Sequence, residues 1–267
     1  MNRIATKFSE IAIAGRKALI PFITAGDPNP DFTVPLMHAM VSAGADIIEL
    51  GVPFSDPMAD GPVIQRASER ALEQGMSLTK VLQIAKEFRH QDQQTPLVLM
   101  GYLNPIEAMH YEVFVKKASE AGIDGVLTVD MPPEEADEYV KLLKSNEIDP
   151  IFLLSPNSND ERIKKMDEAG SGYLYYVSLK GVTGAGNLDT DNVAKKLQQI
   201  RANTDLPIGV GFGVKDAKTA KTIAEFADGV VVGSALISMI EANLAAPEKA
   251  KQEIIERLTA MRQAMDS

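Results

Sequence analysis

Residues 47–50 read Ile-Ile-Glu-Leu, a short apolar run that carries a single acid. Seven further apolar or β-branched runs of three to six residues recur along the chain. Most of them are continuous rather than alternating, which is typical of parallel strands that are covered on both faces. The eight predicted strands are residues 18–23, 47–50, 97–100, 126–129, 151–154, 174–177, 208–210 and 230–232.

The spacing of these runs predicts the architecture. From residue 18 to residue 230 they begin about 30 residues apart on average, which is the length of one strand–helix unit. Eight such units predict a closed (β/α)8 barrel, the TIM-barrel fold, and we expect an extra helix before the first strand. An open doubly wound sheet is the alternative, but it more often has about five or six strands. Because no Pro/Gly/Ser-rich linker divides the chain, we expect a single barrel domain over residues 1–267.

The composition narrows the class of protein. The 267 residues include 27 Lys and Arg, 37 Asp and Glu, no Cys and no Trp, and the formal net charge is −10. The absence of cysteine excludes disulfides, thiolate metal sites and cysteine nucleophiles. An acidic chain without a Lys/Arg block argues against nucleic acid as a partner. No apolar run approaches about 18 residues and the N-terminus has no signal-peptide core, so we expect a cytoplasmic protein without a membrane segment.

One interval in the series is longer than the others, because runs two and three begin at residues 47 and 97. The additional residues follow strand two, on the side of the barrel where enzymes of this fold carry their catalytic loops. We expect a second extended loop after strand six. These loops are therefore the places where a site is expected.

Two carboxylates, Glu49 and Asp60, belong to this second unit. Glu49 stands near the end of an otherwise apolar strand, where desolvation would raise its pKa and allow proton exchange near neutrality. The alternative is a structural pair with Lys or Arg. Asp60 either serves the same site or caps a helix that begins near Pro62. Two acids without His or Cys partners suit acid–base chemistry, and Mg²⁺ usually needs more oxygen ligands than this motif supplies.

Glycines cluster in the loops expected after the last three strands, at residues 180–186, 209–213 and 233–234. In barrels of this kind, the loops after strands seven and eight commonly bind phosphate through backbone N–H groups. Ser234 would add a hydroxyl group. The alternative is that tight strand–helix turns need glycine in any case. Three clusters in the expected loops favour a phosphate site.

Aromatic side chains fall at or near several strand ends, where together they would flank a flat aromatic substrate. Singly, each of them is more often core packing. Asp130, at the end of strand four, is a weaker site candidate, and the three histidines are expected to be structural or surface residues. The aromatic candidates are Phe22, Tyr102, Tyr175 and Phe212.

The segment IELGVPFSDPMADG at residues 48–61 closely resembles the signature of the tryptophan synthase α-subunit family. The resemblance spans nearly the whole chain. Leu179-Lys180 departs from members that carry Arg before the next glycine-rich loop, but this difference does not affect the two carboxylates. The other matching segments are PFITAGDP at 21–28, YLNP at 102–105, GVTG at 181–184 and GFG at 211–213.

The resemblance implies a lyase that cleaves indole-3-glycerol phosphate into indole and glyceraldehyde 3-phosphate by retro-aldol chemistry. Glu49 would protonate ring carbon C3 of the indole and accept the proton of the side-chain hydroxyl as the aldehyde forms. Asp60 would interact with the indole N–H and stabilise the positive charge. Because Asp60 must stay ionised while Glu49 exchanges protons, their environments are expected to separate the two pKa values.

The resemblance also implies the remaining contacts and the partner. Thr183 would help to close the loop after strand six, and the four aromatic candidates would line the indole and glycerol parts of the substrate. No metal or cofactor belongs to this chain, whereas a separate β subunit with pyridoxal phosphate would complete an α₂β₂ assembly. The phosphate would bind to Gly184, Gly213, Gly233 and Ser234, and the partner would contact the region of Pro53, Asp56, Pro57 and Asn104.

Two other functions stay open at this point. Another phosphate-binding barrel enzyme, such as a sugar-phosphate epimerase or indole-glycerol-phosphate synthase, would require a metal or a catalytic Lys near a strand end. A non-catalytic subunit that senses a phosphorylated metabolite would not need both carboxylates. The presence of Glu49 and Asp60 argues against both alternatives.

Overall fold

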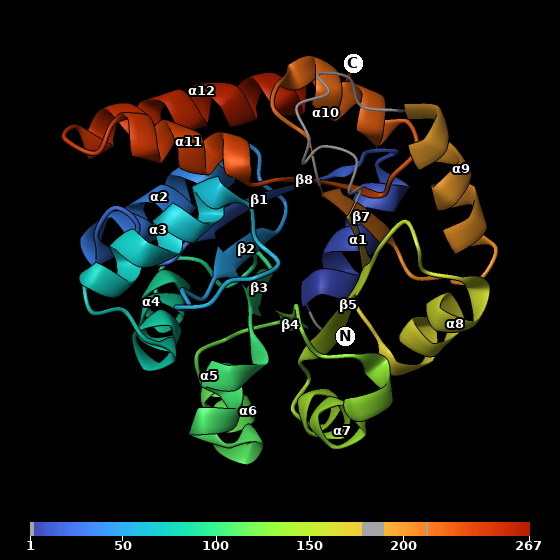
Figure 1. Cartoon of the computed structure of the whole chain (residues 1–267). Helices are drawn as coiled ribbons and strands as arrows, with labels where there is room; N and C mark the ends of the chain where they lie inside the picture. Colours follow the sequence, from blue (N-terminus) through green and yellow to red (C-terminus); the bar gives the residue numbers. More distant parts are fainter. Residues whose placement is uncertain (1–2, 178–189, 212) are drawn as a thin grey trace.

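Eight parallel strands close into a barrel in chain order, and the last strand pairs with the first (Figure 1). The computed structural model describes residues 3–177, 190–211 and 213–267. Each predicted run forms a strand whose ends differ from the prediction by at most two residues, so the predicted TIM barrel is confirmed. The strands are β1 (Ala18–Thr24), β2 (Ile48–Gly51), β3 (Leu97–Gly101), β4 (Gly125–Thr128), β5 (Asp149–Leu154), β6 (Leu174–Val177), β7 (Ile208–Gly211) and β8 (Gly229–Val232).

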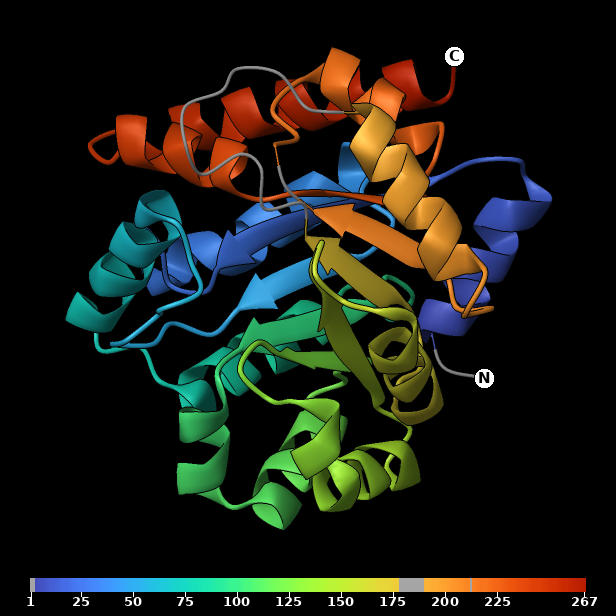
Figure 2. The ribbon, with the colours of Figure 1, turned by 45° about the vertical axis from the view of Figure 1, so that its right-hand side comes forward.

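Helices form a layer around the strands, as Figures 1 and 2 show. Their apolar faces pack on the outside of the barrel, which explains why the strands are apolar on both faces. The outer layer contains α2 (Pro30–Ser42), α4 (Leu78–Arg89), α6 (Tyr111–Glu120), α7 (Asp137–Ser145), α8 (Asp160–Ala169), α9 (Thr190–Arg201), α10 (Ala217–Ala224) and α12 (Pro247–Met265).

A helix before the first strand, α1 (Arg3–Ile13), closes the end of the barrel where the strands begin (Figure 2). Its buried side chains Ile4, Phe8 and Ile11 join the cluster that fills the barrel interior. Ile47 belongs to the same cluster. Since alternate residues of a strand share a face, Glu49 also points into the barrel rather than toward the helices.

Additional helices lie near the opposite end, where the strands finish. α3 (Pro62–Glu73) follows the loop after β2, and α11 (Ser234–Ala242) follows β8 directly. The two helices pack against each other and against β1 (Figure 1). The extended loop after β2 is thus confirmed, whereas the loop predicted after β6 lies outside the described residues. The remaining short elements are α5 (Leu103–Met109) and the 3₁₀ helix η1 (Pro133–Glu135).

Candidate active site

Glu49 lies in β2, opposite Phe22 of β1 and Val98 of β3, and its side chain is completely buried. The hydroxyl group of Tyr173 donates a hydrogen bond of 2.6 Å to Glu49 Oε1. Glu49 Oε2 is buried and has no hydrogen-bond partner among the described residues. One oxygen of this buried carboxyl group therefore has no protein hydrogen bond within the described part of the chain.

Burial raises the pKa of Glu49 to about 8, and the hydrogen bond from Tyr173 opposes this shift only in part. No Lys or Arg in the described part of the chain forms an ion pair with Glu49, so the structural-pair alternative is not supported. A carboxyl group with this pKa holds a proton at neutral pH and can both give and take one.

Asp60 lies in the loop between β2 and α3. The hydroxyl group of Tyr102 donates a hydrogen bond of 2.8 Å to Asp60 Oδ2, and the N–H of Ala59 donates one of 3.0 Å to the same hydroxyl. Gly61 is the N-cap of α3 and has no side-chain capping bond, so Asp60 does not cap this helix. Burial raises the pKa of Asp60, and the Tyr102 hydroxyl opposes the rise.

A small hollow of about 10 Å³ adjoins Asp60 at the mouth of the barrel. Phe22 and Tyr102, both predicted from the sequence, line it together with Thr24. Thr24 was not predicted, although it ends β1 at the same rim. Its hydroxyl oxygen is buried and has no hydrogen-bond partner among the described residues, so it offers a further polar contact at the mouth.

Two glycines leave space for the predicted aromatic side chains. A Cβ atom at Gly51 would lie 2.6 Å from Cζ of Phe22, and one at Gly211 would overlap the hydroxyl group of Tyr175. Tyr175 lies in β6 and is nearly fully buried. Both rings therefore occupy space that a side chain at either glycine would fill. Phe212, the fourth aromatic candidate, lies outside the described residues.

The predicted phosphate residues belong only in part to the described residues. Gly233 is the residue before α11 and Ser234 is its first residue, so the free N–H groups of this helix N-terminus lie beside Phe22. Gly213 has a φ angle of +72°, which favours glycine. The predicted residues Thr183 and Gly184, like Leu179 and Lys180, lie outside the described residues.

Comparisons with known proteins agree with this geometry. A family model described as tryptophan synthase alpha chain matches residues 8–266. The chain belongs to the tryptophan synthase alpha chain family. A curated alpha chain from Methylococcus capsulatus is 62% identical and one from Thioalkalivibrio sulfidiphilus is 61% identical. Each match covers 100% of this chain and 100% of the relative. The solved alpha subunit from Legionella pneumophila str. Paris is 46% identical, with a TM-score of 0.94, over 100% of this chain and 99% of that one.

Membership of the tryptophan synthase alpha chain family decides between the functions that the sequence left open. The chain is a lyase of tryptophan biosynthesis that cleaves indole-3-glycerol phosphate, and neither the other barrel enzymes nor the sensing subunit is favoured. In the described part of the chain, no group of three or more His, Asp or Glu side chains is arranged to hold a metal ion. No described helix has both the length and the apolar character that a membrane span requires.

The residues expected to face a partner lie on the loop after β2 and on α5. Asp56 is exposed and accepts a hydrogen bond of 2.6 Å from the hydroxyl of Ser55, and Asn104 is exposed on α5. Pro53 is buried and Pro57 is half-buried, and both prolines stiffen the loop. Asp130 accepts a hydrogen bond of 2.8 Å from the N–H of Leu103, a structural contact at the start of α5.

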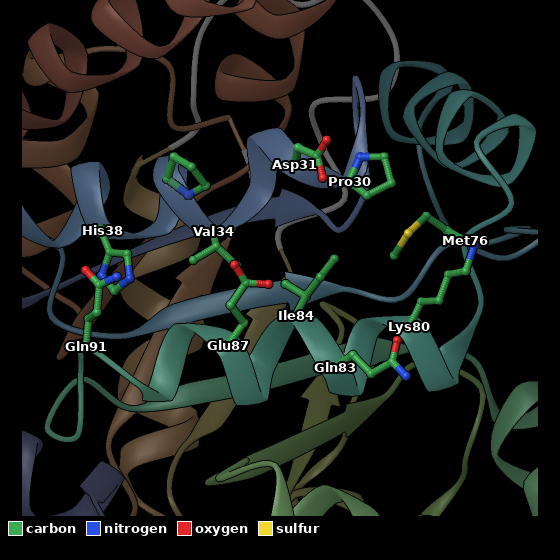
Figure 3. Close-up of a pocket in the computed structure, with 11 residues that line it drawn as sticks. Pro30, Asp31, Val34, His38, Met76, Lys80, Gln83, Ile84, Glu87 and Gln91 are labelled. Atoms are coloured by element: carbon green, nitrogen blue, oxygen red, sulfur yellow. The ribbon is translucent and has the colours of Figure 1, made fainter.

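A larger groove, of about 590 Å³, lies on the outside of the barrel between α2 and α4 (Figure 3). None of the predicted site residues lines it. Its charged side chains Asp31, Lys80 and Glu87 are exposed and carry both signs, so the groove has no buried carboxylate comparable to Glu49. The mouth of the barrel, rather than this outer groove, is therefore the candidate active site.

Proposed function

We propose that Glu49 is the general acid and base of the retro-aldol cleavage. Its protonated carboxyl group delivers a proton to C3 of the indole ring, which becomes cationic. The resulting carboxylate accepts the proton of the neighbouring hydroxyl group as the carbon–carbon bond breaks. The electron pair of that bond returns to the ring. This leaves indole, the aldehyde and a protonated Glu49. The observation that carries the proposal is the completely buried carboxyl group whose pKa is raised to about 8.

Asp60 acts at the other side of the indole ring, where its carboxylate accepts a hydrogen bond from the indole N–H and stabilises the positive charge. Tyr102 orients the Asp60 carboxylate through its 2.8 Å hydrogen bond, and this bond favours the ionised form. Phe22, Tyr175 and Phe212 line the flat ring. Each positioned acid or base contributes about 10²- to 10⁴-fold to the rate.

The phosphate group binds at the N-terminus of α11, where Gly233 and Ser234 present N–H groups and a hydroxyl, and Gly213 of the loop after β7 also contacts it. The free N–H groups and the helix dipole favour an anion there. Gly184 also contacts the phosphate, and Thr183 helps the loop after β6 to close over the substrate and exclude water.

The partner is a tryptophan synthase β subunit in an α₂β₂ assembly, which receives the indole and holds the pyridoxal phosphate. The loop that carries Pro53, Asp56 and Pro57 faces this subunit together with Asn104. Asp56 and Asn104 are exposed, and the loop also carries Asp60, so a partner bound to this loop would lie close to the reacting ring. This chain acts in the cytoplasm, needs no cofactor or metal of its own and binds no nucleic acid.

Release of indole from indole-3-glycerol phosphate tests the residue roles. The purified chain is assayed with a metal chelator, with and without a β subunit, beside Glu49→Gln, Asp60→Asn and the control Glu87→Gln, an exposed residue of the outer groove. We expect slow, metal-independent release that the partner accelerates, a loss of about 10²- to 10⁴-fold in the first two variants, and no loss in the control.

Full activity in Glu49→Gln would refute the acid–base role. Activity that depends on an added metal would favour another barrel chemistry. If the wild-type chain released no indole but still bound phosphate esters and activated a β subunit, a sensing subunit would explain the chain better.

A further inference from the structure

Four charged side chains join α3, α11 and the loop after β1 at the rim of the barrel. Arg70 donates from Nε and Nη2 to the two carboxylate oxygens of Asp27, at 2.7 and 2.9 Å, and from Nη1 to Glu241 Oε1 at 3.1 Å. Arg66 donates to both oxygens of Glu241, at 2.6 and 2.8 Å. We call this set the rim network.

The centre of the rim network is buried. The Asp27 side chain is 0% exposed and that of Arg70 is 17% exposed, whereas the Arg66 side chain is 47% exposed. A paired arginine fork and carboxylate fix both distance and orientation, because two parallel N–H bonds must be satisfied at once. The arginines hold the pKa of Glu241 at about 2, so this carboxylate stays charged at ordinary pH.

The network connects the two ends of the proposed substrate site. α3 begins two residues after Asp60, which the proposed function places at the indole ring, and α11 begins at Ser234, which it places at the phosphate. Both helices are additional to the one helix per strand that the barrel needs, and they pack side by side against β1 (Figure 1). Their spacing is therefore not fixed by the barrel alone.

We propose that Arg70 is a positioning residue that sets the distance between the indole-binding and the phosphate-binding ends of the mouth. This inference rests on the proposed function of Asp60 and Ser234. A ligand that occupies both ends needs the correct spacing, whereas a ligand that occupies one end does not. Misplacement by about 1 Å is enough to cost about 100-fold in such a site.

The affinities of three ligands distinguish a change in the distance between the two ends of the mouth from a general loss of stability. The non-cleavable indole–propanol phosphate spans both ends, glycerol 3-phosphate occupies only the phosphate end, and indole occupies only the ring end. Affinities are measured by calorimetry for the wild type, Arg70→Met, Arg70→Lys and Arg66→Gln. The matched control is Arg262→Met, because Arg262 forms a similarly buried pair with Asp46, at 3.0 Å, at the opposite end of the barrel.

We expect Arg70→Met to lower the affinity for the spanning ligand by about 10- to 100-fold, whereas glycerol 3-phosphate and indole bind with their wild-type affinities. Arg70→Lys keeps the charge but loses the fork and shows a smaller loss, and Arg66→Gln, at the exposed edge, shows the smallest. KM for indole-3-glycerol phosphate rises, and the pH dependence of kcat is unchanged because Glu49 has no contact with the rim network. Arg262→Met changes none of these quantities.

Equal weakening of all three ligands in Arg70→Met, or no weakening of any, would overturn the positioning role. If Arg70→Met does not fold, the comparison of Arg70→Lys with Arg66→Gln decides the same question. A wild-type chain that fails to bind the spanning ligand would instead refute the proposed function, which is a different result.

Discussion

Both ends of the barrel hold carboxylates that are wholly or partly buried, but different side chains donate hydrogen bonds to them. At the end where the strands begin, three aspartates stand just before β2, β4 and β8, and each accepts a backbone N–H from the preceding strand and a hydrogen bond from an arginine. At the mouth, Glu49 and Asp60 accept hydrogen bonds from tyrosine hydroxyl groups. The first set is Asp46 with Leu19 and Arg262, Asp124 with Leu97 and Arg89, and Asp228 with Ile208 and Arg201.

This difference teaches how one fold separates structural acids from reactive ones. An arginine supplies a counter-charge that opposes the rise in pKa that burial causes, and its hydrogen bonds hold a paired aspartate such as Asp46 in place. A tyrosine orients a carboxylate but supplies no counter-charge, so burial raises the pKa of Glu49. Asp27 is the exception at the mouth, since it pairs with Arg70. By the same rule it belongs to the structural group.

The largest expected effect separates stability from activity. Arg89→Met removes the 2.7 Å bond from Nη2 to the buried Asp124 and the donors to the carbonyl oxygens of Gly122 and Thr95. Arg3 still pairs with Asp124 at 2.8 Å, so we expect a loss of about 3 kcal/mol in the free energy of unfolding, the lower end of the range for breaking a buried pair. Urea denaturation measures this loss. We expect kcat and KM of the folded variant to stay at the wild-type values, because Arg89 lies at the end away from the mouth. A variant with normal stability and a low kcat would contradict the division between the two ends.

The second effect concerns the pH dependence of stability. The pKa of Glu49 is raised from 4.5 to about 8 by burial, so the folded chain holds this proton more tightly than the unfolded chain. Its contribution to stability is complete below pH 4.5 and is lost as the pH rises to about 8. The Glu49→Gln variant has no carboxyl group to titrate at this position. Its free energy of unfolding is therefore expected to fall less than that of the wild type between acid and alkaline pH, by a few kcal/mol.

Urea denaturation at several pH values measures this difference, with Asp130→Asn as the control because Asp130 is exposed. The control is expected to follow the wild type over the whole pH range. Parallel curves for Glu49→Gln and the wild type would mean that Glu49 does not titrate abnormally in the folded chain.

The fold was predictable because its signals are local. An apolar run such as residues 126–129 encodes a buried parallel strand by itself, and β4 occupies Gly125–Thr128. The long interval after β2 also located the loop that carries Asp60. Glu49 was predicted because an acid is rare in a strand that is apolar on both faces.

The partners of these acids were not predictable, because they depend on contacts between distant residues. Tyr173 lies 124 positions from Glu49, and it precedes β6 at a place where a core tyrosine is equally plausible from the sequence. Arg70 and Glu241 are 171 positions apart and look like ordinary polar residues of two helices. Only the closed strand order, which brings α3 beside α11 over β1, places them together.

The smallest effect tests whether the tyrosine tunes Glu49 or only fills space. Tyr173→Phe removes the 2.6 Å hydrogen bond that lowers the pKa of Glu49, so this pKa rises further above its ordinary value and the pH profile of kcat moves to higher pH. Loss of one hydrogen bond costs about 0.5–1.5 kcal/mol, so the rate falls by at most about tenfold. Tyr139→Phe is the control, because Tyr139 is buried in α7 against Tyr111. An unchanged pH profile in Tyr173→Phe would mean that Glu49 is not the group that controls the rate, and the contrast between the two ends of the barrel would then be structural only.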